Sequence, residues 1–540
     1  MLKLRSLLVA GLVASPVFAA QSGIDLRWSY ENAFTGQKVK GHREVELKDS
    51  SQAMQKSILV VKMSSTITAA LADYKATCND VEKGEDVKPD PRIAPEPGRI
   101  PVMPGPVPPR GEQEFTAKCK AEKVKVADTL EKEQIALTKA ATRLPKMAAL
   151  ESRKLEKNLE YLGKLAKLIR DAKPSIWGGR GMPRFALEAA APTMRITTGG
   201  AQDAQKFRDM VDSKEIPTPA DYQAYGLINE FDLYIAGESC DQLLCVSPVV
   251  SIDKAAKKLY MQANMGTNME VDKFERPPIN LAIALDVSGS MSSPDNTKKS
   301  RLDWAKDAVR ETLRNLVPGQ DHFTLVYFSD EARVIWPVQD EARAITVEDK
   351  QEILNILDGL KTLGSTNLRA GLDLAYEQVG KSKKAIEKFG HPSFENRVIM
   401  ITDANLNYGD TDESSAVIEV EKQSRTRGIN LTTIGVGMNF FADFINKLSI
   451  LRGSNYIFAQ DGERMLEYFQ QFPTLVTPVA YDFVAEVSVD SAKAKLVRVH
   501  GVPEVKAEKA KDDLFSISTL FFAAPKTKGG GARILEFDLK

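Results

Sequence analysis

Three short side chains that carry oxygen follow an aliphatic run near the middle of the 540-residue chain. The run covers residues 281–285 (Leu-Ala-Ile-Ala-Leu), and Asp286, Ser288 and Ser290 come after it at alternate positions. An uninterrupted aliphatic run is typical of a strand that is buried on both faces of a parallel sheet. Open α/β sheets bind their ligands at the carboxyl ends of such strands. Because hydroxyl and carboxylate oxygens are hard ligands, we expect a site for Mg²⁺, Mn²⁺ or Ca²⁺ and not for zinc.

Two later segments carry oxygen side chains that could reach the same place. Thr366 lies in a tight turn before a predicted helix, and Asp403 follows a second aliphatic strand. In a doubly wound sheet, the ends of these elements can meet at one edge, where a cation with an open position would accept a carboxylate from another protein. The predicted ligands are Asp286, Ser288, Ser290, Thr366 and Asp403. The Asp-x-Ser-x-Ser spacing alone is equally typical of a helix-capping turn.

Strands and helices alternate from Pro278 to Phe472, which predicts a doubly wound, mostly parallel α/β sheet. After the strand at 281–285, the further predicted strands are 322–328, 397–401, 430–436 and 455–459. The helices predicted between them are 301–316, 353–360, 368–379, 413–427, 440–451 and 462–472. Asp410, Asp412 and Glu413 lie just beyond Asp403, where an exposed acidic helix start is favoured over a second cation site.

The five predicted ligands, in this order and on these elements, resemble the metal-ion-dependent adhesion site of von Willebrand factor type A (VWA) domains. Arg-Pro-Pro-Ile-Asn at 276–280, Asn-Arg-Val-Ile at 396–399 and the three glycines at 529–531 resemble the bacterial YfbK-type proteins of this superfamily. The resemblance implies a Rossmann-like fold and metal-dependent protein binding without catalysis. Ser365 and Ala404 stand where glycine is common in the family, but neither is a predicted ligand.

The amino terminus is typical of an exported protein. A basic start, an apolar stretch and small residues predict a signal peptide over residues 1–20. No later segment has about 20 uninterrupted apolar residues, so we expect no transmembrane segment in the mature chain. The expected location is the periplasm or cell surface of a bacterium. The 73 basic and 73 acidic residues balance, which argues against a nucleic-acid partner.

The remaining chain divides by composition. The predicted regions are an amino-terminal region with a proline-rich loop (21–112), a helical hairpin (113–172), a linker (173–215), a β-rich framework (216–277 and 478–540) and the inserted VWA domain (278–473). Residues 57–63 and 227–235 are predicted as strands within these regions. Four cysteines in an exported chain favour two disulfides, Cys78 with Cys119 and Cys240 with Cys245, over a zinc site.

The predicted function is adhesion or assembly in a bacterial envelope, through a partner's Asp or Glu carboxylate bound to the cation, and not catalysis. Two alternatives stay open. In a structural envelope protein the cation would only stabilise the loops. In a metal-assisted hydrolase the open cation would activate water, although the sequence identifies no general base.

Overall fold

The computed structural model describes most of the chain. The described residues are 23–46, 54–78, 117–145, 147, 149–172, 193–198, 204–235, 240–270, 273–294, 299–337, 343–388, 394–403, 409–436, 442–459, 466, 468–502, 514–523 and 530–540. The predicted signal peptide and the proline-rich loop lie outside these residues. None of the described helices is long and apolar enough to cross a membrane.

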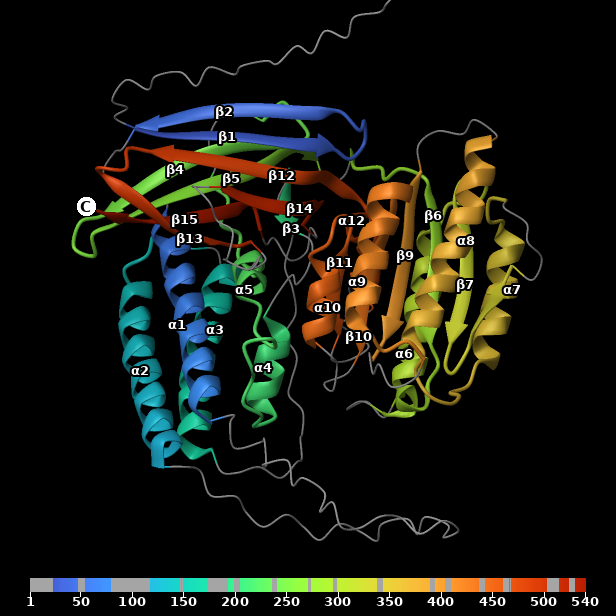
Figure 1. The fold of residues 1–540 in the computed structure, drawn as a ribbon, viewed down its shortest axis with the longest axis horizontal. Coiled ribbons are helices and arrows are strands. Elements are labelled where there is room, and N and C mark those ends of the chain that lie inside the picture. The colour runs from blue at the N-terminus through green and yellow to red at the C-terminus, as the bar shows by residue number, and fades with distance from the viewer. Residues whose placement is uncertain are drawn as a thin grey trace, which may run out of the picture.

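A six-stranded sheet forms the α/β part of the molecule (Figure 1). Its order is β11-β10-β9-β6-β7-β8, and all neighbours are parallel except β8, which runs antiparallel to β7. The strands are β6 (Ile279–Asp286), β7 (His322–Phe328), β8 (Ala332–Trp336), β9 (Glu395–Thr402), β10 (Ile429–Val436) and β11 (Asn455–Ala459). The predicted doubly wound α/β fold is therefore confirmed, with β8 as an addition that the sequence did not indicate.

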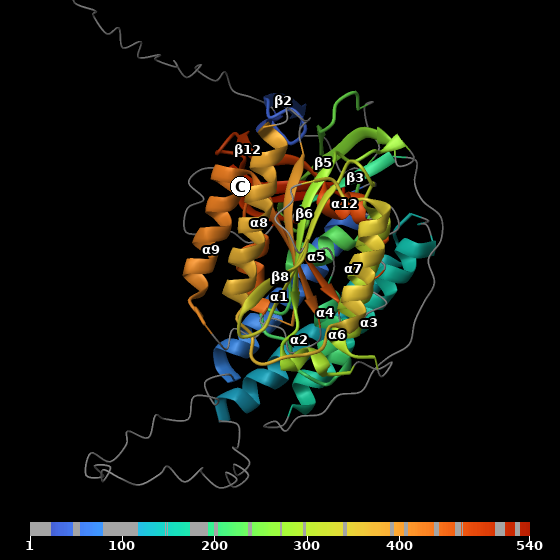
Figure 2. The ribbon, with the colours of Figure 1, turned by 90° about the vertical axis from the view of Figure 1, so that its right-hand side faces the viewer.

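Helices cover both faces of this sheet (Figure 2). One face carries α6 (Arg301–Asn315), α7 (Val347–Gly359) and α12 (Phe472–Val476), and the other carries α8 (Leu368–Lys388), α9 (Glu413–Lys422) and α10 (Ala442–Ser449). Alternate residues of β6 face opposite cores, Leu281 and Ile283 toward α6 and Ala282 and Ala284 toward α8. Because both faces are buried, β6 is aliphatic throughout its central residues.

A nine-stranded, antiparallel sheet forms the second part, and the α/β part is inserted between its strands β5 and β12. The path runs β13-β15-β5-β3-β14-β12-β1-β2, and β4 pairs with β5. Its strands are β1 (Gly23–Asn32), β2 (Lys38–Glu46), β3 (Thr193–Thr198), β4 (Cys245–Asp253), β5 (Lys258–Glu270), β12 (Pro478–Val489), β13 (Ala494–His500), β14 (Leu514–Phe522) and β15 (Ala532–Leu539). Strands β1, β2 and β3 therefore lie outside residues 216–277 and 478–540, the two segments that were predicted to form the β-rich framework.

Five helices pack against one side of the nine-stranded sheet (Figure 1). They are α1 (Gln55–Cys78), α2 (Ala117–Ala141), α3 (Ala149–Asp171), α4 (Gln205–Asp212) and α5 (Ala224–Glu230). The neighbours α2 and α3 lie within the region predicted as a helical hairpin. The disulfides Cys78–Cys119 and Cys240–Cys245 are both present, as predicted, and the first joins α1 to α2.

Three predictions for this part are wrong. Residues 57–63 belong to helix α1, because apolar residues such as Leu59, Met63 and Ile67 form one buried helical face. The first part of the strand predicted at 227–235 lies in helix α5, whose Leu227 and Ile228 are buried under the sheet, and the rest forms only an isolated bridge at Asp232. The predicted linker 173–215 contains strand β3 and helix α4, so its described part is not a simple connector.

Polar contacts fix the α/β part to the nine-stranded sheet. Arg452 pairs with Asp482 and donates to Glu31 Oε1 at 2.8 Å. Asn430 Nδ2 donates to the Tyr481 hydroxyl at 2.8 Å. Asn430 and Arg452 lie at the amino ends of β10 and β11, so these contacts leave the carboxyl ends of the strands free for a site.

Candidate metal centre

The first loop of the site begins where β6 ends. Asp286 is fully buried, and its Oδ1 accepts a 2.8 Å hydrogen bond from the backbone N–H of Ser288. The Val287 N–H donates to Phe328 O at 2.9 Å, which anchors the loop to the end of β7. A short 3₁₀ turn, Gly289–Ser292, follows. The Ser288 and Ser290 hydroxyl oxygens lie 3.0 Å apart, so both point to the same place.

The loop that carries Thr366 lies directly against this first loop. The Leu363 N–H donates to Val287 O at 2.6 Å, and the Gly289 N–H donates to Gly364 O at 3.0 Å. Gly364 has φ +25°, and a Cβ there would collide with the Asp330 carboxylate, which explains the glycine. Thr366 itself is 1% exposed. The backbone contacts therefore bring the segment with Thr366 to the tip of β6.

The third loop enters from β9, the neighbour of β6. Asp403 Oδ1 accepts a 3.0 Å hydrogen bond from the Ser290 hydroxyl. One residue earlier, the Thr402 hydroxyl donates to Asp286 Oδ2 at 2.6 Å. The structure thus links Asp286, Ser288, Ser290 and Asp403 by side-chain or backbone hydrogen bonds, and it places the loop of Thr366 beside them.

Two residues of the site were not predicted from the sequence. Thr402 holds Asp286, and Arg301, the first residue of α6, donates from Nη1 to Asp403 Oδ2 at 2.7 Å. The Thr402 hydroxyl could have been noticed beside Asp403 at the end of an aliphatic strand. A basic residue at the start of a helix gives no comparable signal, because its partner is set only by the fold.

The electrostatics of the site are dominated by burial. Burial raises the pKa of Asp286 to about 6, hydrogen bonds from Thr402 and Ser288 oppose this rise, and the nearby Asp403 charge adds to it. A buried carboxylate with a raised pKa is stabilised in its ionised form by a cation. The site therefore favours positive charge.

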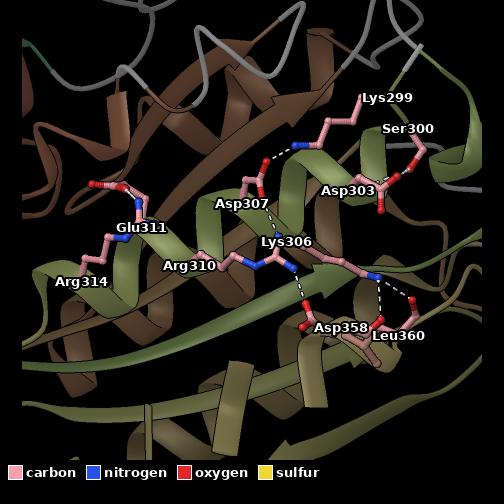
Figure 3. Close-up of polar contacts among 10 residues, drawn as sticks. All are labelled: Lys299, Ser300, Asp303, Lys306, Asp307, Arg310, Glu311, Arg314, Asp358 and Leu360. Atoms are coloured by element: carbon pink, nitrogen blue, oxygen red, sulfur yellow. Dashed lines mark hydrogen bonds and ion pairs between the residues drawn. The ribbon is translucent and has the colours of Figure 1, made fainter. Parts of the chain in front are cut away.

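Helix α6 also contacts the end of α7, from which the chain continues to Thr366 (Figure 3). The buried Lys306 donates from Nζ to Leu360 O at 2.7 Å and reaches Asp358 O at 3.5 Å, at the end of α7. Arg310 of the same helix pairs with Asp307 and Asp358. These contacts fix the end of α7, where residues 360–367 begin. They therefore help to position Thr366 indirectly.

The donor set fits a hard divalent cation. Both oxygens of Asp286 and of Asp403 already accept hydrogen bonds from the protein, whereas the serine hydroxyl oxygens keep lone pairs for an ion. Within the part of the chain that the structure describes, no three His, Cys, Asp or Glu side chains form a metal-binding group. Any cation here would depend on neutral hydroxyls, with carboxylates acting through hydrogen bonds or water.

The acidic residues beyond Asp403 match the helix-start interpretation. Asp412 accepts a 3.0 Å hydrogen bond from the Ser414 N–H and caps α9. Asp410 accepts from the Ser415 hydroxyl at 2.8 Å, and Glu413 pairs with Lys447. Their oxygens serve the helix and its neighbours.

Comparison with known proteins agrees with this geometry. The family described as von Willebrand factor type A domain matches residues 281–405. The Escherichia coli K12 protein YfbK is 29% identical over 222 residues, which cover 40% of this chain and 35% of that protein. This chain contains a VWA domain. This chain matches about a third of the length of the Escherichia coli relative.

Solved structures similar to this chain include the following two proteins. A von Willebrand factor type A protein from Catenulispora acidiphila is 13% identical, covers 56% of this chain and 67% of its own, and has a TM-score of 0.36. The manganese-loaded TRAP protein of Plasmodium vivax is 15% identical, covers 48% of this chain and 97% of its own, and has a TM-score of 0.26. Both TM-scores are low, so neither likeness carries an argument about this chain.

Proposed function

We propose that the VWA domain binds a divalent cation, Mg²⁺ first, and that the cation binds an Asp or Glu carboxylate of a partner protein. The proposed ligands are Asp286, Ser288, Ser290, Thr366 and Asp403. The observation that carries the proposal is the convergence of three loops from separate parts of the chain on the paired hydroxyls of Ser288 and Ser290. A turn that only capped a helix would need no contact with Asp403.

The residues of the site would perform this binding as follows. Hydroxyl oxygens coordinate the ion directly without neutralising it, and the two carboxylates act mainly through hydrogen bonds and water. The ion therefore keeps much of its positive charge for a partner carboxylate. Gly289 is exposed and Ser290 is half-buried, so a partner could approach from that side. Binding through such a site is expected to be lost with the metal.

Protein binding is proposed rather than hydrolysis. A hydrolase needs a group that takes a proton from the attacking water. Asp286 and Asp403 accept hydrogen bonds on both oxygens, from Ser288, Thr402, Ser290 and Arg301, and neither is placed as a free base. The two disulfides support the proposal that the protein acts in an oxidising compartment, the periplasm or the cell surface of a bacterium.

The test has two steps. Calorimetric titration of the full chain with Mg²⁺ should show one site that Ser288→Ala weakens strongly. A pull-down from envelope extract should then retain a partner with Mg²⁺ and release it with EDTA, and Ser288→Ala should retain none. A cation that stabilises the fold without changing retention would support the structural alternative. Turnover of ester, phosphoester or peptide substrates that depends on the metal would support the hydrolase.

A further inference from the structure

Arg301 is a fixed positive charge at the edge of the proposed metal site. Its Nη1 lies 2.7 Å from Asp403 Oδ2, while the other oxygen of this carboxylate accepts from the Ser290 hydroxyl. Asp403 thus stands between the guanidinium and a proposed ligand. Arg301 is 18% exposed on its side chain, so its charge is only partly screened by water.

The backbone around Arg301 holds this position. The Arg301 N–H donates to Ser293 O at 3.1 Å, and Pro294 forms an antiparallel bridge with Ser300. The Ser300 hydroxyl accepts from the Asp303 N–H at 3.1 Å and caps α6. The start of α6 is therefore tied to the turn Gly289–Ser292 that carries Ser290, and the two cannot move far apart without breaking these bonds.

The guanidinium changes the charge balance of the site. Two buried carboxylates, Asp286 and Asp403, and one guanidinium carry a net charge of minus one. A divalent cation then makes the site positive. Without Arg301 the same cation would be neutralised by the two carboxylates. Arg301 therefore opposes the binding of the metal and favours the subsequent binding of an anion.

We propose that Arg301 sets the specificity of this site by trading metal affinity for carboxylate affinity. The inference rests on the proposed function, since it assigns a role at the same site. It goes beyond that function because it predicts that one substitution at Arg301 changes the cation affinity and the carboxylate affinity in opposite directions. A residue that only supported the fold would change both in the same direction.

The size of the effect follows from Coulomb's law in a partly buried site. A unit charge a few ångströms from the ion, at the effective dielectric constant of a protein near its surface, changes an affinity by about tenfold after screening. We expect Arg301→Gln to bind the cation about tenfold more tightly and a carboxylate about tenfold more weakly.

The experiment uses Mn²⁺ and acetate as probes on the full chain at pH 7.5 and constant ionic strength. Electron paramagnetic resonance of free Mn²⁺ gives the metal affinity. Acetate that coordinates bound Mn²⁺ displaces water, so the fall in water proton relaxation gives the carboxylate affinity. Arg314→Gln is the matched control, because it removes the same charge from α6 but only from an exposed pair with Glu311 (Figure 3).

The expected result is tighter Mn²⁺ and weaker acetate binding for Arg301→Gln, with Arg314→Gln and Arg301→Lys close to the wild type. Loss of both affinities, or no change in either, would overturn the inference. If Arg301→Gln does not fold, the Arg301→Lys variant provides the test. This variant keeps the positive charge, so a loss of its acetate binding would show that charge is not the cause. The proposed function would instead be refuted if the wild-type protein bound no Mn²⁺, or if Asp286→Asn did not weaken its Mn²⁺ binding.

Discussion

The Ser290 hydroxyl and Asp403 Oδ1 form a 3.0 Å hydrogen bond although 113 residues separate them in the chain. The bond exists because β6 and β9 are adjacent and parallel, so that both residues leave the sheet at the same edge. It joins two of the three loops of the proposed metal site. A site that depends on such long-range contacts is sensitive to changes in any one loop.

Asp286→Asn should weaken cation binding without unfolding the protein. The amide keeps the shape of the carboxylate and can still accept from the Ser288 N–H or the Thr402 hydroxyl, but it lacks the charge that favours the ion. We expect Mg²⁺ affinity to fall by at least about tenfold, because the site loses one of the two negative charges that attract the cation. Calorimetry measures the affinity, and the melting temperature without metal serves as the folding control. Unchanged Mg²⁺ affinity would contradict the assignment of Asp286.

Thr366→Val tests the ligand whose side-chain position is inferred from its loop. Valine keeps the volume of threonine and removes the hydroxyl, and residue 366 is buried beside the tip of β6. We expect Mg²⁺ affinity to fall about tenfold while the free energy of unfolding without metal changes by about 1 kcal/mol. Ser365→Ala, one residue away, is the control and should leave the affinity unchanged. Equal effects of the two substitutions would exclude Thr366 as a specific ligand.

The sequence predicts those parts of the VWA domain that are encoded locally. Aliphatic runs such as 281–285 are long, buried on both faces and bounded by polar residues, so β6 and its parallel neighbours could be predicted. The run at 57–63 is also largely apolar but continues as a helix with one buried face, and a short apolar run does not distinguish a strand from a helix.

Residues whose role depends on distant partners could not be predicted. Arg301 begins an ordinary amphipathic helix, and only the fold brings Asp403 to it. Lys306 reads as a solvated lysine on α6, yet it is buried against the end of α7. Strands β1 and β2 contain charged residues such as Arg27 and Lys40 on their outer faces, so they lack the aliphatic signal of the central strands.

Lys306→Met should loosen the Thr366 loop. Methionine fills a similar volume but leaves the carbonyl oxygens of Asp358 and Leu360 without the Lys306 ammonium group. A hydrogen bond from a charged group contributes about 1.5–3 kcal/mol, so we expect a loss of up to this order in urea unfolding and faster hydrogen exchange over residues 360–367. Arg314→Gln is the control on α6, because its exposed pair with Glu311 should contribute little (Figure 3). Equal stability of the two variants would show that Lys306 does not hold the loop.

Glu536→Gln should lower stability in a way that depends on pH. Glu536 on β15 contacts His500 Nε2 at 2.9 Å and pairs with Lys258 at 2.7 Å. The pKa of Glu536 is lowered from 4.5 to about 2, and the hydrogen bond with His500 is the largest cause. The folded state favours the ionised form of the Glu536 carboxylate. Its contribution to the free energy of unfolding is therefore complete above about pH 5 and is lost as the pH falls toward 2.

We expect Glu536→Gln to reduce the free energy of unfolding by about 1–2 kcal/mol at pH 7, less than the full shift implies because the side chain is partly exposed. The gap to the wild type should shrink between pH 5 and pH 3, as measured by urea unfolding of both proteins at each pH. Glu486→Gln is the control, because it makes the same substitution at an exposed position of β12 in the same sheet. A gap that stays constant as the pH falls would mean that the loss comes from packing of the β15 side chain and not from its charge.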